Sequence, residues 1–312
     1  MSINIVLFTL SGLFILLLGA NYLIENIVLL AKKTNISQFI ITSCTVALGT
    51  TIPELTTSLK SILSTPPHPG IAVGNLIGSN IANILLIIGT AAIIYPIKIN
   101  FEKWVNLEIK INFIIILFPA SIIFLNLTQN ISFYLSILIL ISFFYFIFER
   151  INSDKDNVNK KQNVDQSTFL IVSKVIISFV ALVVGSYYLI DGSIQIAQHF
   201  KVSERVIGLS LVAIGTSLPE LITAILASIK KIHGIALGNV LGANAYNILG
   251  ILSLVEIIEP SSILENTKKI DIYFLIISTI LLSLFIIKAK KISRLNALLF
   301  LFIYILYIYL IY

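Results

Sequence analysis

The sequence predicts an all-α polytopic membrane protein with ten transmembrane helices, arranged as two inverted repeats of five helices each. Apolar residues make up 57% of the 312 residues and charged residues only 12%. Apolar runs of about twenty residues, the length that spans a bilayer, recur along the whole chain. The two halves also resemble each other in sequence, and the second and seventh helices are expected to be discontinuous.

The ten predicted spans follow from the apolar runs and the short polar breaks between them. They cover residues 3–31, 36–63, 70–95, 107–127, 130–150, 168–198, 203–229, 234–258, 271–288 and 293–311. The first run is long and has no basic segment before it, so we expect a transmembrane helix and not a cleaved signal. The most polar stretch, NSDKDNVNKKQNVDQS (152–167), is expected to be a solvated linker.

An internal repeat divides the chain into three parts, with boundaries at 1–150, 151–167 and 168–312. The repeat motifs lie in 36–95 and 202–258, with 10 identities in 24 aligned positions and then 8 in 14. Five spans per repeat is an odd number, so the two halves should enter the membrane from opposite sides. Such inverted repeats are typical of secondary transporters, which bind substrate at the midplane between the repeats.

Positive charges predict the orientation in the membrane. If the N-terminus is outside, 16 of the 21 Lys and Arg residues lie in inward loops or at inward helix ends. By the positive-inside rule, this favours N- and C-termini outside and a cytoplasmic 151–167 loop, in the plasma (cell inner) membrane. The same distribution explains the net charge of +6 without a nucleic-acid partner. The bilayer is the expected surrounding, and no obligate protein partner is inferred.

Two motifs, GTTIPEL and GTSLPEL, interrupt the second and seventh spans. Pro53 lacks an N–H and crowds the carbonyl of Gly49, and Pro219 does the same to Gly215. Each helix is therefore expected to open around its glycine and to free carbonyl groups. At membrane depth such groups need protein, water or an ion as a partner.

Oxygen-bearing side chains accompany both breaks. The hydroxyls are those of Thr50, Thr51, Thr216 and Ser217, the carboxylates those of Glu54 and Glu220, and the amides those of Asn83 and Asn247. A charge at the bilayer centre costs roughly 2.5–3.5 kcal/mol on insertion scales, so two carboxylates call for a cation. Hard oxygen ligands favour Ca²⁺ or Na⁺ over zinc, copper or iron. Two carboxylates neutralise one Ca²⁺ or two Na⁺, as an exchanger requires.

The paired motifs, each followed by GN and then GSN or GAN, resemble the α-repeats of the sodium/calcium exchanger family in the calcium/cation antiporter superfamily. The resemblance covers essentially the whole chain and is greatest to the minimal prokaryotic type. It implies ten helices, a central cluster of four cation sites, and Na⁺ entry that drives Ca²⁺ out with net movement of charge. It implies a transporter and not an enzyme, with transported ions and no cofactor.

The same resemblance implies the cation ligands. They are Ala47, Thr50, Thr51, Glu54, Ser79, Asn83, Ala213, Thr216, Ser217, Glu220 and Asn247, with Ala47 and Ala213 acting through their carbonyls. Two positions depart from the family pattern, because Ala243 stands where serine is common and Asn247 where some members have Asp. An amide at 247 argues against K⁺ cotransport and excludes proton coupling at that residue.

Several alternatives remain open from sequence. A Ca²⁺/H⁺ or other divalent-cation/H⁺ antiporter fits the same scaffold, and a passive cation channel or a membrane scaffold without transport are further possibilities. Glu54 and Glu220 could instead form structural ion pairs, and the hydroxyls could bond back to carbonyls one helical turn earlier. Small residues are common at helix interfaces in membranes, so close helix packing is predicted at Gly74, Gly78, Gly238 and Gly242. Interhelical hydrogen bonds are expected for Asn75, Asn80, Asn239 and Asn244.

Overall fold

The computed structural model describes residues 3–34, 36–99, 102–153, 165–199 and 217–311, and nearly all of them are helical. The α-helices are α1 (Ile3–Thr34), α2 (Gln38–Ile41), α3 (Ala47–Thr50), α4 (Ile52–Ile62), α5 (Pro69–Ala82), α6 (Gly89–Ile94), α7 (Glu102–Phe124), α8 (Gln129–Ser153), α9 (Thr168–His199), α12 (Leu218–Ile229), α13 (His233–Ala245), α14 (Ser253–Ile258), α15 (Ser262–Asn266), α16 (Lys269–Leu284) and α17 (Arg294–Ile311). The wider π-helical turns are η1 (Thr42–Val46), η2 (Asn83–Ile88), η4 (Tyr246–Leu252) and η5 (Phe285–Ala289). Two short strands, β1 (Ile97–Lys98) and β2 (Lys291–Ile292), complete the described part.

The helices follow the predicted spans to within a few residues. Within the described ranges, eight helices are long and apolar enough to cross a membrane, and the bent pair formed by 38–50 and 52–62 makes up to nine. The seventh predicted span is represented by α12, and its residues 203–216 lie outside the described part. The predicted linker falls largely outside it as well.

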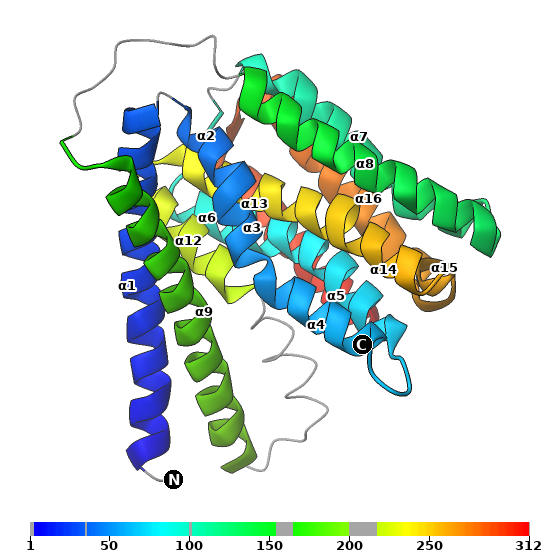
Figure 1. Ribbon diagram of the computed structural model, residues 1–312, viewed down its shortest axis with the longest axis horizontal. Helices are drawn as coiled ribbons and strands as arrows, with labels where there is room; N and C mark the ends of the chain where they lie inside the picture. The colour runs from blue at the N-terminus through cyan, green and yellow to red at the C-terminus, as the bar shows by residue number, and fades with distance from the viewer. Residues whose placement is uncertain (1–2, 35, 100–101, 154–164, 200–216, 312) are drawn as a thin grey trace.

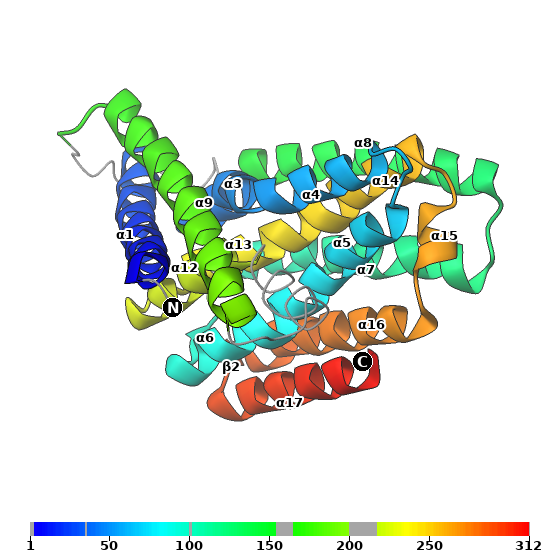
Figure 2. The same cartoon turned by 90° about the horizontal axis from the view of Figure 1, so that it is seen from below.

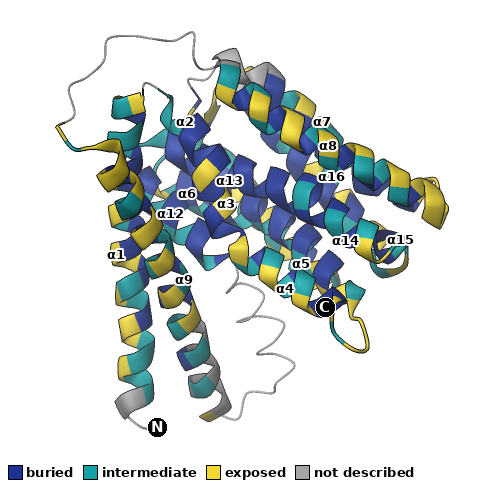
Figure 3. Ribbon diagram, in the orientation of Figure 1, coloured by how far each residue is buried: buried dark blue, intermediate teal, exposed yellow. Residues whose placement is uncertain are grey.

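The most buried spans lie in the middle of the molecule (Figure 3). In the most apolar stretch of the segment from α13 to α14, 78% of the residues are buried; the share is 67% for the segment from α5 to α6 and only 17% for α17. The peripheral helices turn large apolar side chains outward, among them Phe14, Leu138 and Phe169. Lipid tails are as apolar as these side chains, so such a surface suits a bilayer.

Helices α1 and α9 lie side by side along their length, at an angle to the remaining helices (Figures 1 and 2). Glycines allow this contact. A Cβ atom at Gly12 would lie 2.4 Å from the Leu189 backbone nitrogen, and one at Gly185 would lie 2.5 Å from that of Leu16. The two backbones therefore touch directly, as small residues permit in membrane proteins.

Three loops that the charge pattern assigns to one side of the membrane meet at one end of the molecule. Strand β1 pairs antiparallel with β2, so that Lys98 lies opposite Lys291. The Tyr95 ring stacks on His233 at the start of α13, with centroids 5.8 Å apart. This basic end combines loops from both halves of the chain, which the sequence did not predict as a contact.

Candidate functional site

The second span is broken at Thr51, immediately before its carboxylate. Thr51 (φ −85°, ψ 1°) separates α3 from α4, and the helices on either side of it are bent by 42°. Gly49 itself stays helical, so the expected opening around it is wrong by two residues. Pro53, in the first turn of α4, starts the new helix and cannot donate to the Gly49 carbonyl. Glu54 consequently lies in the first turn of α4, where the helix dipole favours negative charge.

The described part of the seventh span begins in the same way. Ser217 (φ −91°, ψ 8°) precedes α12, Pro219 lies in its first turn, and Glu220 follows. The remaining ligand candidates of this motif, Ala213 and Thr216, lie outside the described residues, as does Gly215. The two motifs thus share their geometry wherever both are described.

The two carboxylates come together in the interior. Glu54 and Glu220 are each 1% exposed and close enough to repel each other electrostatically. The Ser217 hydroxyl, from the second motif, donates to Glu54 Oε1 at 3.4 Å. Within the described ranges, Glu54 Oε2 and both carboxylate oxygens of Glu220 have no hydrogen-bond partner. The ion pairs among the described residues involve Glu25 and Glu108, so the alternative of a structural ion pair finds no basic partner for either glutamate there.

Side chains from α5 and α13 reach the same place. The Ser79 hydroxyl lies 3.5 Å from that of Ser217. The Thr50 hydroxyl, near Glu220, lies 3.2 Å from Asn239 Oδ1 and can donate to it. Four elements from the two halves of the chain, namely α3–α4, α5, α12 and α13, therefore contribute polar atoms to one buried cluster.

Two amides lie at the starts of the π-turns. Asn83 begins η2 and Asn247 is the second residue of η4, at corresponding positions of the two halves. Asn83 Nδ2 donates to Asn244 Oδ1 at 2.9 Å, and its Oδ1 has no hydrogen-bond partner among the described residues. Asn247 is fully buried, and no described residue forms a hydrogen bond with its Oδ1 or its Nδ2. π-turns are frequent at functional sites, so their occurrence at Asn83 and Asn247 is consistent with a functional role for these two amides.

The remaining candidates of the first motif are bonded within their own helix. Thr51 Oγ1 donates to the carbonyls of Ala47 at 2.9 Å and Leu48 at 3.1 Å, which is the back-bonding that sequence left open. The Ala47 carbonyl also accepts the Thr51 N–H at 3.0 Å. An ion at this carbonyl would therefore have to displace or share the hydroxyl donors.

Glycines bring α13 against the first broken helix. A Cβ at Gly242 would lie 2.5 Å from both the Ala47 Cβ and the Ser43 carbonyl oxygen, and one at Gly238 would lie 2.7 Å from the Phe39 carbonyl oxygen. The packing role is confirmed at these two positions, whereas described neighbours leave open space around Gly74 and Gly78. The Phe179 ring of α9 also covers the first broken helix at Gly49, where a Cβ would lie 2.5 Å from the ring.

The predicted asparagine contacts are confirmed in part. Asn239 and Asn244 bond to other helices, as expected. Asn80 Nδ2 instead donates to the Leu76 carbonyl within α5, at 2.9 Å. The expectation of an interhelical hydrogen bond is therefore wrong for Asn80, whose amide donates within its own helix.

Tyr246 is a residue that sequence reasoning missed. Its hydroxyl donates to the Cys44 carbonyl in η1 at 2.7 Å, which provides a partner for backbone in a widened turn. The corresponding residue of the first half is Ala82, which has no such group. The replacement of alanine by tyrosine at this position, between otherwise similar repeats, was the feature of the sequence that could have indicated a special role for Tyr246.

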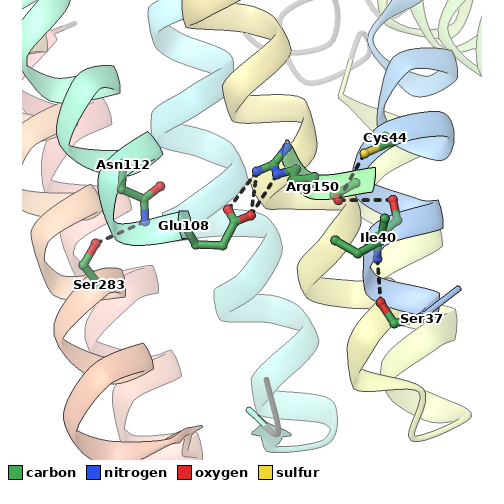
Figure 4. A network of polar contacts seen from close by, with 8 residues as sticks. Ser37, Ile40, Cys44, Glu108, Asn112, Arg150 and Ser283 are labelled. Carbon is green, nitrogen blue, oxygen red and sulfur yellow. Dashed lines mark hydrogen bonds and ion pairs between the residues drawn. The ribbon is translucent and has the colours of Figure 1, made fainter. Parts of the chain in front are cut away.

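A second missed feature is a buried ion pair between α7 and α8 (Figure 4). Arg150 Nε donates to Glu108 Oε1 at 2.9 Å, and its second nitrogen donates to Oε2 at 2.8 Å. Arg150 is 1% exposed, so its charge is enclosed by the protein. An acidic residue at the start of the fourth predicted span and a basic residue at the end of the fifth were the signal for it.

Comparison with known proteins identifies the family. The profile of the sodium/calcium exchanger protein family matches residues 4–151 and 171–312. This chain belongs to the sodium/calcium exchanger family. It is 32% identical over 296 residues to an uncharacterised membrane protein of Methanocaldococcus jannaschii, covering 95% of this chain and 94% of the relative. It is 30% identical over 331 residues to the sodium/calcium exchanger MaX1 of Methanosarcina acetivorans, covering 92% and 93%.

A solved structure supports the same assignment. The sodium–calcium exchanger NCX_Mj, soaked with zero Na⁺ and Ca²⁺, matches with a TM-score of 0.85 and 31% identity, over 100% of both chains. The predicted membership of the minimal prokaryotic type is therefore confirmed. As a member of the sodium/calcium exchanger family, the protein is a multi-pass membrane transporter of the exchanger type and not an enzyme.

Proposed function

We propose that this exchanger moves Na⁺ and Ca²⁺ in opposite directions through one central site by alternating access. The observation that carries the proposal is the meeting of Glu54 and Glu220, two buried carboxylates from two broken spans. In the part of the chain that the structure describes, three of their four oxygens lack a hydrogen-bond partner and no basic side chain pairs with them. Buried charges without compensation are costly, and a bound cation removes that cost.

The proposed ligands come from both halves. We assign the ions to Ala47, Thr50, Thr51, Glu54, Ser79, Asn83, Ala213, Thr216, Ser217, Glu220 and Asn247. The clustering of Thr50, Ser79 and Ser217 around the two glutamates supports this set. The proposed architecture is ten helices in two inverted repeats, 1–150 and 168–312, joined by the 151–167 linker.

Charge balance is the basis of the proposed exchange. Two carboxylates neutralise one Ca²⁺ or two Na⁺, so the two cargoes compete for the same charges. The neutral oxygens can accept a further Na⁺, and exchange of more than two Na⁺ for one Ca²⁺ would be electrogenic. The amide of Asn247 supplies no third negative charge, so we propose that transport is independent of K⁺.

We propose that the protein resides in the plasma membrane with both termini outside. The basic end, which contains Lys98, Lys231 and Lys291, would then face the cytoplasm, as the positive-inside rule favours. Cysteine labelling of loops on either end in intact cells tests this orientation.

The decisive experiment is Ca²⁺ uptake into vesicles that contain the purified protein, with an imposed Na⁺ or pH gradient. We expect uptake to follow an outward Na⁺ gradient and to generate a membrane potential. Glu54→Gln and Glu220→Gln should each abolish uptake while the protein still inserts. Glu25→Gln is the matched control, because Glu25 is an exposed carboxylate paired with Lys230 and lies outside the proposed ligand set.

Other results of this uptake experiment would favour a different function. Uptake that ignores Na⁺ and follows the pH gradient would indicate a divalent-cation/H⁺ antiporter. Downhill Ca²⁺ flux with no counter-ion requirement would indicate a channel. Full activity in both glutamate variants would refute the assigned site.

A further inference from the structure

A pocket of about 390 Å³ lies at the basic end, apart from the proposed ion site. Its lining includes Gln38, Lys98, Lys231, His233 and Gly234. These residues come from the start of α2, from β1, from the turn that joins α12 to α13, and from the first turn of α13. The pocket thus lies where helices end, at the level expected for lipid headgroups.

The pocket is positively charged and its described lining contains no carboxylate. Lys98 lies opposite Lys291 across the two-stranded sheet, so its strand neighbour is a cation and not an acid. Glu25, on an adjoining helix, is already paired with Lys230 at 3.1 Å. The lysines of the lining therefore create a positive potential that no described lining residue neutralises.

The start of α13 adds hydrogen-bond donors. Its N-cap residue is Ile232, which offers no side-chain acceptor, and the N–H groups of His233 and Gly234 make no hydrogen bond in the described part of the chain. His233 Nδ1 is buried and also has no partner there. A helix N-terminus with free N–H groups carries partial positive charge and favours anions, phosphate above all.

Aromatic contacts hold these groups in place. The Tyr95 ring stacks on His233 with an interplanar angle of 17°, and Lys231 Nζ lies 5.1 Å from the centroid of the same ring. Lys231 has a φ of 60°, a left-handed conformation that lysine rarely adopts, and its N–H bonds to the Ser228 carbonyl. The turn therefore presents Lys231 and His233 in a fixed arrangement on the pocket wall.

We propose that this pocket binds a phosphate group, carried by an anionic lipid headgroup or present as free phosphate. Two lysines, an unpaired imidazole and an uncapped helix N-terminus surround it, and basic pockets between transmembrane helices commonly bind anionic headgroups. The pocket is larger than one phosphate, so it has room for the rest of a headgroup. This site is independent of the carboxylate cluster and of the exchange proposed for it.

The test measures ligand retention by the intact protein. Native mass spectrometry of protein from phosphatidylglycerol or phosphatidylcholine nanodiscs reports bound lipid, and thermal unfolding in neutral detergent with added inorganic phosphate or chloride reports the free anion. The test variant is Lys98→Gln with Lys231→Gln. The control variant is Lys32→Gln with Lys288→Gln, two exposed lysines that the sequence assigns to the same side and that do not line the pocket.

We expect wild type and control to retain phosphatidylglycerol and the test variant to bind it roughly 30-fold more weakly, at about a fivefold loss per lysine near a surface. Selective protection by inorganic phosphate alone, lost in the test variant, would identify free phosphate as the source. Equal losses in the two double variants, or no binding of either probe, would overturn the proposal. Because neither measurement uses ion flux, its failure is distinguishable from failure of the exchange function.

Discussion

Replacing Gly242 by alanine is expected to separate α13 from the first broken helix. The new Cβ would lie 2.5 Å from the Ser43 carbonyl oxygen and the Ala47 Cβ, whereas ordinary contact begins at 3.4 Å. The contacting atoms are backbone or bound directly to it, so the helices must part by about 0.9 Å, with overpacking typically costing about 1–3 kcal/mol. The 3.2 Å contact between Thr50 and Asn239 would then stretch beyond hydrogen-bonding distance.

The expected result is a 10- to 100-fold loss of Na⁺-driven Ca²⁺ uptake, because misplacement by about 1 Å can cost two orders of magnitude in a preorganised site. Gly250→Ala is the matched control. The three described atoms nearest to its Cβ would belong to the Phe143 ring, at 3.3 Å or more, and a small ring movement accommodates them. Wild-type uptake by the Gly242 variant would refute the reasoning that α13 and the broken helix must stay in contact.

Three further predictions follow from particular contacts. Tyr246→Phe leaves the Cys44 carbonyl without its donor, so we expect a loss of about 1–3 kcal/mol in stability and faster amide hydrogen exchange in η1; unchanged exchange there would contradict a role in holding the turn. Arg150→Met leaves Glu108 buried and unpaired and should cost about 3–5 kcal/mol in unfolding experiments, and adding Glu108→Leu should restore most of it. Asn247→Asp adds a negative charge at a fully buried position and should change cation preference or the pH dependence of uptake; identical behaviour would exclude this residue as a ligand.

The break in the second span could be predicted because its cause is local. Pro53 removes one backbone hydrogen-bond donor and Glu54 follows directly, so this short motif is enough to predict a break in the helix. The same motif does not predict which residue leaves the helical conformation. Thr51 does so because the new helix begins at Ile52, with Pro53 in its first turn, where a missing N–H has no cost.

Features that depend on distant contacts were not predictable. The turn η1 occurs where a tyrosine from α13–η4, some 200 positions later in the chain, reaches the Cys44 carbonyl. Glu108 and Arg150 are 42 positions apart, and only the packing of α7 on α8 brings them together. The pairing of β1 with β2 likewise depends on how α6 and α17 lie against each other. Hydrophobic periodicity carries no information about such pairings.

The glycine contacts between α1 and α9 have a mechanical consequence. Backbones that touch at Gly12 and Gly185 cannot slide independently without losing their packing, so the two helices form one rigid body. That body also carries Phe179, whose ring covers Gly49 one residue before Thr50. A tilt of α1 and α9 together would therefore move the Phe179 ring away from the broken helix. This movement would expose the hydroxyls of Thr50 and Thr51. Cross-linking α1 to α9 should leave such a movement intact, whereas cross-linking α9 to α3 should prevent it.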